Sequence, residues 1–187
     1  MNEAGWEVCL LDKDALLKES IEMFQEIYQQ QFASSIDVNH SLPIEIRSFR
    51  QDGPWRIFLL VCPWMLCRLF VPDQLLSGLT VPNGWESQER TEAEYVAMGP
   101  SLTFKVRESV QKANIQYHKN LGHFLIQPLI FSMFKYKSAD VAFDAWSSVI
   151  QHRDDMMQKK QKSCGWQKEL SRREMFSGMF AEREDAI

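Results

Sequence analysis

Apolar side chains recur every three or four residues in the first part of the chain. This spacing, which places side chains on one face of a helix, holds for Leu17, Ile21, Phe24, Tyr28 and Phe32. Asp12 precedes the run and is a residue type that caps helix N-termini. We therefore predict an amphipathic helix from Asp12 to Phe32, closed by the polar stretch Ser34–Ser41.

The pattern becomes strand-like after Pro43. Ile44–Phe49 alternates apolar and polar residues, and Trp55–Val61 is almost entirely apolar. Alternation is typical of a strand with one buried face, and a continuous apolar run suits a strand covered on both faces. The turn signal Asp52-Gly53-Pro54 lies between them. We predict that the two strands pair as a hairpin.

Pro63 interrupts this sheet. Proline has no N–H to donate to a ladder, so the strand should bend, bulge or end there before Met65–Val71 continues extended. Trp64 would then stand outside regular structure.

A long loop and two further strands follow. Residues 72–100 are rich in polar residues, glycine and proline, which predicts a loop with one helical turn at Glu89–Tyr95. Leu102–Val106 alternates again, and Gly122–Phe131 is a second apolar run interrupted by Pro128. Both are predicted strands.

The last part of the chain is predicted to be helical. Ser138 is a candidate N-cap for a helix to about Met157, and a short helical tail at Glu169–Phe180 follows a lysine-rich linker. We predict an α+β fold: a mainly antiparallel sheet with an N-terminal and a C-terminal helix, plus the tail. One domain would span residues 1–157, and linker and tail residues 158–187.

Composition narrows the classes of function. The formal net charge is −4 and the pI near 5.6, whereas nucleic-acid binders usually carry a basic excess. No apolar run approaches the roughly 18 to 20 residues that span a bilayer, and the acidic N-terminus does not resemble a secretory signal. We expect a cytoplasmic protein without a nucleic-acid partner or a membrane span.

Candidate chemistry is sparse. No glycine-rich phosphate loop occurs, and the histidines and cysteines lack zinc-like spacing. Cys62 and Cys67 are separated by four residues, not by the two of a thioredoxin-type pair, and are expected to be buried thiols. His118 and His123 are interpreted as surface or core histidines. The sequence predicts no enzyme activity, no cofactor and no metal.

Two segments have the composition of binding surfaces. In Pro63-Trp64-Met65 a large aromatic residue and a thioether follow a strand-breaking proline, which favours either a protein interface or a core aromatic at a bulge. Ser171–Phe180 places four large apolar residues beside Arg172 and Arg173. That tail is either docked back on the domain or a helix-in-groove ligand for another protein.

Three landmarks carry a resemblance to a known family. Cys62–Pro72 resembles the Pro-Trp-Phe/Met-Met/Leu strand of the HybE/HupJ/HoxT hydrogenase accessory proteins. Phe124–Met133 is similar to the second signature of that family, with Gln127 where the family has serine, and a helix follows it. Ser171–Gly178 is similar to the family's Ser-Arg-Arg-x-Phe-Leu-Arg-Gly tail, which itself resembles a twin-arginine signal.

The resemblance implies a chaperone that holds nickel-iron hydrogenase large or small subunit precursors during cofactor insertion and before twin-arginine export, with other accessory proteins as further partners. It assigns client binding to Pro63, Trp64 and Met65, with Pro128 and Leu129 alongside if the two strands are neighbours. In the tail it assigns Arg172, Arg173 and Phe176. Some relatives carry a rubredoxin, but this chain lacks the Cys-x-x-Cys pairs, so no iron is expected.

Two rival functions remain at this point. One is a redox or oxygen-protective accessory protein that uses Cys62 and Cys67. The other is an adaptor whose basic segment Lys159–Arg173 binds an acidic partner electrostatically.

Overall fold

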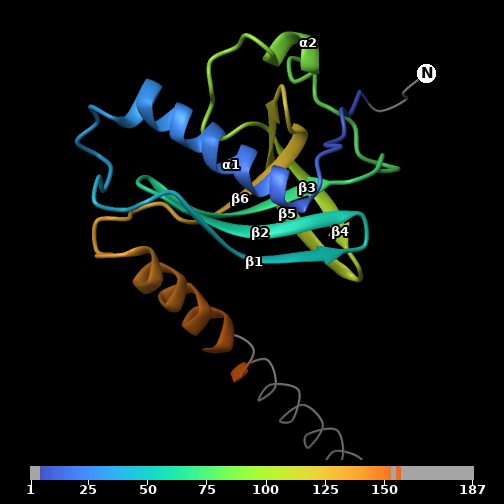
Figure 1. Ribbon diagram of the computed structural model, residues 1–187. Helices are drawn as coiled ribbons and strands as arrows, with labels where there is room; N and C mark the ends of the chain where they lie inside the picture. The colour runs from blue at the N-terminus through green and yellow to red at the C-terminus, as the bar shows by residue number, and fades with distance from the viewer. Residues whose placement is uncertain (1–4, 153–154, 157–187) are drawn as a thin grey trace, which may run out of the picture. The chain divides into compact units, whose positions relative to one another are not determined.

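The computed structural model describes residues 5–152 and 155–156 (Figure 1). By its internal contacts the chain divides into two compact units, Met1–Phe143 and Asp144–Ile187, and the architecture given below is that of the first unit. The predicted tail and linker lie outside the described residues, and the domain boundary at residue 157 stays a prediction.

Helix α1, Lys13–Ile27, forms where the three-to-four-residue spacing predicted it. The Asp12 carboxylate accepts a hydrogen bond from the Ala15 amide at 2.8 Å, which caps the helix as expected. The helix continues into η1, a π-helical turn at Tyr28–Phe32. Arg56 holds the segment before α1, because its buried guanidinium donates to the carbonyls of Leu11 and Cys9 at 2.6 and 2.8 Å.

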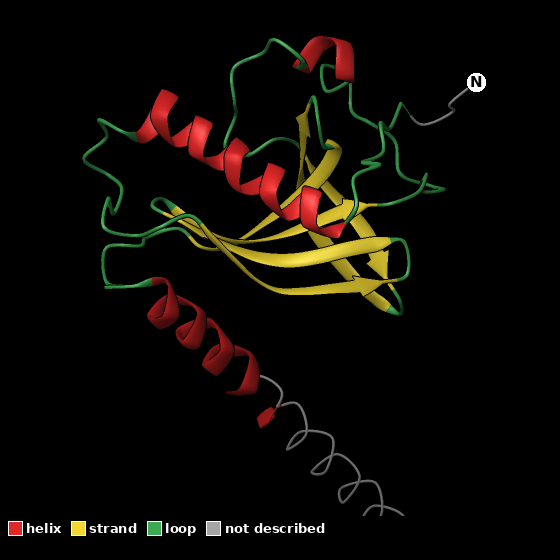
Figure 2. Cartoon of the chain, in the orientation of Figure 1, coloured by secondary structure: helices red, strands yellow, loops and turns green. Residues whose placement is uncertain are grey.

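Six strands form one sheet, which is yellow in Figure 2, and their order is β1-β2-β3-β6-β5-β4. Every neighbouring pair is antiparallel. The strands are β1 Glu45–Asp52, β2 Trp55–Cys62, β3 Met65–Pro72, β4 Ser101–Val106, β5 Ser109–His118 and β6 Gly122–Ile130. With a helix before the sheet and another at residues 139–152, the predicted α+β class is confirmed.

The sheet has an apolar cluster on each face. Phe24 and Leu16 of α1 pack with Phe58 and Phe124 on one face, which is the face that α1 crosses in Figure 1. On the other face, Trp55, Phe70 and Phe104 pack with Trp6 and Trp85 from outside the sheet. A continuous apolar run therefore marks β2 because both of its faces are covered.

The sheet is strongly curled. Trp55 of β2 and Phe104 of β4 are four places apart in the strand order, yet their ring centroids lie 4.8 Å apart. The Trp55 indole donates to the Lys105 carbonyl at 3.2 Å, and Arg107 pairs with Asp52 at 2.5 Å. The ends of β2 and β4 are thus brought together, as in a partly closed barrel.

Some boundaries differ from the prediction. Strand β5 was not predicted, although residues 113–118 alternate apolar and polar side chains. The helical turn in the long loop is α2 at Ser87–Arg90, slightly earlier than expected. Strand β1 is longer than predicted and contains a bulge between Arg47 and Arg50. In the described part of the chain, no helix is long and apolar enough to cross a membrane.

Candidate protein-binding site

Pro63 and Trp64 form the two-residue turn between β2 and β3, whose last pair is Cys62 and Met65. The proline ends β2, as its missing N–H predicted. The Pro63 carbonyl accepts a hydrogen bond from the backbone amide of Asn39 at 2.9 Å. The turn is thereby joined to the loop that follows η1.

Trp64 lies in the core. Only 8% of the residue is exposed, and its ring is nearly parallel to the rings of Phe32, Phe24 and Tyr28, at centroid distances of 4.4, 5.8 and 6.4 Å. The indole Nε1 is buried without a hydrogen-bond partner among the described residues. The π-helical turn brings Tyr28 and Phe32 onto this stack.

Pro63 and Met65 are buried as well. Of the two interpretations that the sequence left open for this segment, the structure has the core aromatic, placed at a turn and not at a bulge. The three residues do not form an outward ridge in this conformation, and their part in client binding stays a prediction.

The two signature segments are neighbours in the sheet. Strand β3 pairs with β6, and Pro128 lies opposite Cys67 across an irregularity in the register. Pro128 and Leu129 are half-buried, so both are partly accessible where Trp64 is not. The sequence analysis placed Pro128 and Leu129 beside Pro63-Trp64-Met65 only if the two strands were neighbours, and β3 and β6 are neighbours.

The structure adds exposed apolar residues that the sequence did not single out. Phe131 and Phe134 follow β6 and are 63% and 59% exposed, and Ile36 in the loop after η1 is 88% exposed. We call Ile36, Phe131 and Phe134, with the half-buried Pro128 and Leu129, the apolar end. The sequence carried little signal for them, because Ile130 and Met133, their direct neighbours, are apolar as well.

Asn39 holds the parts of the apolar end together. Its backbone amide donates to the Pro63 carbonyl, and its side-chain amide donates to the carbonyls of Met133 and Tyr136 at 3.0 and 2.8 Å. Asn39 therefore links the loop after η1, to which it belongs, both to the loop after β6 and to the β2–β3 turn. These hydrogen bonds hold the backbone of the loop that contains Phe131 and Phe134.

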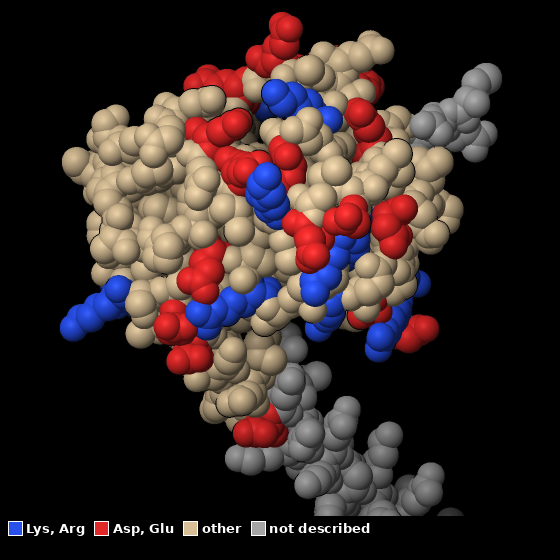
Figure 3. Space-filling model, viewed as in Figure 1, with Lys and Arg blue, Asp and Glu red and all other residues tan. Residues whose placement is uncertain are grey.

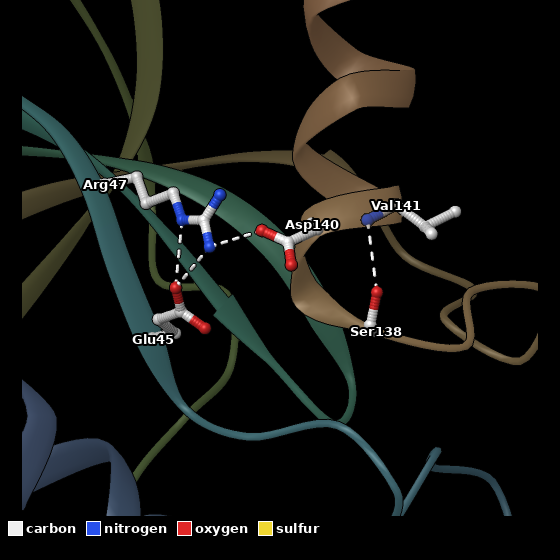
Figure 4. A network of polar contacts seen from close by, with 5 residues as sticks. All are labelled: Glu45, Arg47, Ser138, Asp140 and Val141. Atoms are coloured by element: carbon white, nitrogen blue, oxygen red, sulfur yellow. Dashed lines mark hydrogen bonds and ion pairs between the residues drawn. The ribbon is translucent and has the colours of Figure 1, made fainter.

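The C-terminal end of the loop after β6, where the helix at residues 139–152 begins, is held by a polar network around Arg47 of β1 (Figure 4). The guanidinium donates to Glu45 at 2.9 and 2.7 Å, and it pairs with Asp140 in the first turn of the 139–152 helix at 2.5 Å. It also lies 4.9 Å from the centre of the Phe143 ring. The predicted cap is present too, since the Ser138 hydroxyl accepts from the Val141 amide at 3.4 Å.

The cysteines are poorly suited to redox chemistry. Cys62 and Cys67 are fully buried, and their thiols donate to the carbonyls of Met65 and Leu60 at 3.2 and 3.7 Å. Burial raises the pKa of both thiols, whereas the thiolate is the reactive form. This arrangement weighs against the redox alternative and fits the expectation of buried structural cysteines.

The histidines have structural surroundings. His123 is fully buried; its Nδ1 accepts from the Glu7 amide at 2.9 Å, and its Nε2 donates to the Trp85 carbonyl at 2.9 Å. Desolvation lowers the pKa of His123 and of His118. Within the described residues no group of His, Cys, Asp and Glu side chains is placed to hold a metal ion. Arg172, Arg173 and Phe176 lie outside the described residues.

Comparison with known proteins gave two matches. The family model described as "[NiFe]-hydrogenase assembly, chaperone, HybE" matches residues 15–178. Among solved structures, the solution structure of HybE from Escherichia coli is similar, with 14% sequence identity and a TM-score of 0.45, over 73% of this chain and 72% of that one. No curated protein matches this sequence.

Proposed function

This chain belongs to the HybE family of nickel-iron hydrogenase assembly chaperones, and from that premise we propose that it binds a hydrogenase subunit precursor through the apolar end. The client is a large or small subunit precursor, held in the cytoplasm while cofactors are inserted and before twin-arginine export. Binding and release are the whole of the activity, and no bond in the client is made or broken.

One observation carries the proposal: two phenylalanines stand more than half exposed, at 63% and 59%, on a loop whose surroundings are fixed. Exposed apolar surface marks a binding site where it is contiguous, and Phe131 and Phe134 lie three positions apart on one loop. Asn39 and the Arg47 network fix the neighbouring backbone, so little conformational entropy is lost when a partner binds. A chaperone that must grip unfinished subunits needs such a surface.

The charges around the apolar end suit a transient complex. Lys135 and Lys137 follow Phe134 and are exposed, and the Lys135 ammonium lies 5.1 Å from the centre of the Tyr136 ring. Rim charges of this kind set the rate and orientation of encounter, while the aromatic anchors supply the affinity. Arg172, Arg173 and Phe176 of the tail are proposed as additional contacts to the partner.

The test is the variant Phe131→Ser/Phe134→Ser, assayed by affinity co-purification of the large and small subunit precursors from hydrogenase-expressing cells. Each buried aromatic anchor typically contributes at least about 2 kcal/mol to binding, so recovery of the precursor should fall to background. Val110→Ser is the matched control, because Val110 is also 63% exposed but lies at the start of β5.

The variant must keep its fold for this result to count, and circular dichroism and the urea midpoint check that. Exposed serines in place of exposed phenylalanines should leave both unchanged within about 0.5 kcal/mol. Undiminished precursor recovery by the folded double variant would remove the apolar end as the binding surface. A loss equal to that of Val110→Ser would do the same.

A further inference from the structure

Strand β4 is one of the two edges of the sheet, and it pairs with β5 in continuous antiparallel register. The Ile115 amide of β5 donates to the carbonyl of Pro100, just before β4, at 2.9 Å. Alternate residues of an antiparallel strand direct their N–H and C=O groups towards the partner strand and away from it. This hydrogen bond therefore implies that Ser101, Thr103 and Lys105 direct their backbone groups away from β5.

The Lys105 carbonyl agrees with this direction, since it accepts a hydrogen bond at 3.2 Å from the Trp55 indole across the curl of the sheet. Among the described residues, no other hydrogen bond reaches the outward backbone groups of Ser101, Thr103 and Lys105. The N–H and C=O groups of Ser101 and Thr103, and the N–H of Lys105, are thus available to another strand.

The opposite edge of the sheet, β1, is protected against such pairing. Its register with β2 shifts between Arg47 and Arg50, and Ser48 within this bulge has φ +57°. Bulges and charged side chains are the devices by which sheet edges avoid further strands. In β4 the register has no shift, and Lys105 is the one charged residue of the strand. The two edges therefore differ in their capacity to accept a strand.

A hollow of about 430 Å³ lies beside the free edge. It is lined by residues 103–105 of β4 and by residues 74–79, which follow β3. Leu76 and Leu79 are half-buried and pack against the apolar cluster on that face of the sheet, and Leu75 is 56% exposed. The hollow thus combines free backbone groups on one wall with apolar side chains on the other.

Charge alone selects no partner at this end of the sheet. In Figure 3 lysine and arginine side chains lie among acidic ones over the lower right of the face in view, where Figure 1 places the β1–β2 turn and β4. Arg107 is paired with Asp52, whereas Lys105 is exposed and forms no ion pair with another described residue. The backbone groups beside Lys105 require a ligand in the extended conformation.

We propose that β4 binds an extended segment of a partner protein as a further antiparallel strand. Residues of that segment opposite Thr103 and Lys105 would exchange backbone hydrogen bonds with β4. Because directly opposite side chains share a face of the sheet, these residues would place an acidic side chain beside Lys105. The alternate residues would place apolar side chains on Leu76 and Leu79. The site shares no residue with the apolar end, so the proposal goes beyond the proposed function and does not depend on it.

The probe is a fluorescent peptide of alternating glutamate and valine, titrated into the full-length protein and followed by anisotropy. Two N-methylated forms of this peptide are compared. Methyl groups on the glutamate amides remove the donors that face β4, whereas the same number on the valine amides removes donors that face away. We expect at least about tenfold weaker binding of the first form, because several hydrogen bonds are lost, and less than about threefold weaker binding of the second.

Variants of the protein test the same contacts from the other side. Thr103→Pro removes the outward N–H without removing a hydrogen bond from the β4–β5 ladder, so binding should weaken about fivefold. Thr103→Val keeps the amide and a β-branched side chain and should bind within about twofold of the wild type. Lys105→Gln should weaken binding about threefold at low salt, whereas Lys119→Gln, at an exposed lysine between β5 and β6, should not.

Circular dichroism and the urea midpoint check that the variants are folded, and the comparison of the two methylated peptides on the wild type needs no variant. The proposal is overturned if the glutamate-valine peptide does not bind, if its two methylated forms bind equally, or if folded Thr103→Pro binds it as the wild type does. Sedimentation equilibrium distinguishes a second copy of this chain as the occupant: a dimer that Thr103→Pro dissociates would assign β4 to self-association and overturn the proposal.

Discussion

Trp64 is the residue at which a binding role and a structural role compete most directly. Its ring is stacked among Phe24, Tyr28 and Phe32, which come from α1 and η1. Offset aromatic contacts add to the area that each ring buries. The side chain therefore contributes to folding in this conformation, and the neighbouring exposed phenylalanines are better placed to meet a partner.

We predict that Trp64→Ala destabilises the protein by about 3 to 5 kcal/mol, because it leaves a cavity between η1 and the β2–β3 turn. Trp64→Phe is the matched variant: it keeps an aromatic ring in the stack and removes the unpaired indole N–H, so its cost should be much smaller. Urea unfolding followed by circular dichroism measures both. A fully stable Trp64→Ala protein would mean that the ring is not part of the core.

At the scale of elements, the N-terminal segment is held to the sheet by His123 of β6. Its Nδ1 accepts from the Glu7 amide, its Nε2 donates to the Trp85 carbonyl, and Tyr117 of β5 donates to the Glu7 carboxylate at 2.9 Å. The backbone adds a bond from the His123 amide to the Glu7 carbonyl. Gly122 has φ +66°, and a Cβ there would lie 2.2 Å from that carbonyl, so only glycine lets the two segments approach.

This arrangement predicts a pH dependence of stability. Desolvation lowers the pKa of His123 in the folded state, so the unfolded chain takes up the proton first as the pH falls. Stability should be complete above the unfolded pKa of about 6.5 and should decrease as the pH falls below it towards the folded pKa. Protonation would set an N–H at Nδ1 against the Glu7 amide and release the segment.

The measurement is the urea midpoint between about pH 7.5 and about pH 5, values that bracket the unfolded pKa of histidine. In His123→Gln the decrease should be smaller than in the wild type, and what remains is assigned to His118, whose pKa is also lowered. His152→Gln, at an exposed histidine, controls for the removal of an imidazole from the surface. An unchanged profile in His123→Gln would show that this histidine does not couple proton uptake to folding.

The local amino-acid pattern was sufficient to predict the elements whose sequence signals are strong. The spacing in α1, the Asp12 and Ser138 caps, the end of β2 at Pro63 and the α+β class follow from nearest-neighbour chemistry. Strand β5 was missed because its first half, residues 109–112, has Val110 as its single apolar residue, and the short alternation at residues 113–118 was not interpreted as a strand. Its strand character comes from pairing with β4 and β6, which is not local.

The candidate site was less accessible to sequence reasoning for the same physical reason. The sequence located the turn at Pro63 and Trp64, but what covers Trp64 is η1, more than thirty positions earlier in the numbering. Exposure depends on such distant partners. Phe131 and Phe134 have the same composition as core residues, and only the arrangement of the loops around Asn39 shows that they remain exposed.

At the scale of the whole molecule, the chain offers two surfaces of different chemistry. The apolar end would hold the client by burying aromatic side chains, which depends little on salt, whereas Arg172 and Arg173 of the tail would attract an acidic segment, which depends strongly on salt. A client that engages both surfaces gains from effective concentration and need not bind tightly to either. Weak separate contacts also allow release once assembly is complete.

The tail can be tested against this scheme by deleting Ser171–Ile187. If Arg172, Arg173 and Phe176 contact the partner, the truncated protein should bind the small-subunit precursor about tenfold more weakly, because two charged contacts and one aromatic contact are lost. The urea midpoint should not change if the tail adds nothing to the core. The variant Arg172→Gln/Arg173→Gln in the full chain separates the effect of charge from that of apolar contact. If its affinity for the precursor is reduced only at low salt, the effect belongs to the arginines. That result would favour the electrostatic adaptor interpretation of Lys159–Arg173. Equal affinity of the truncated and full-length proteins would exclude the tail from the binding surface and leave the apolar end to act without it.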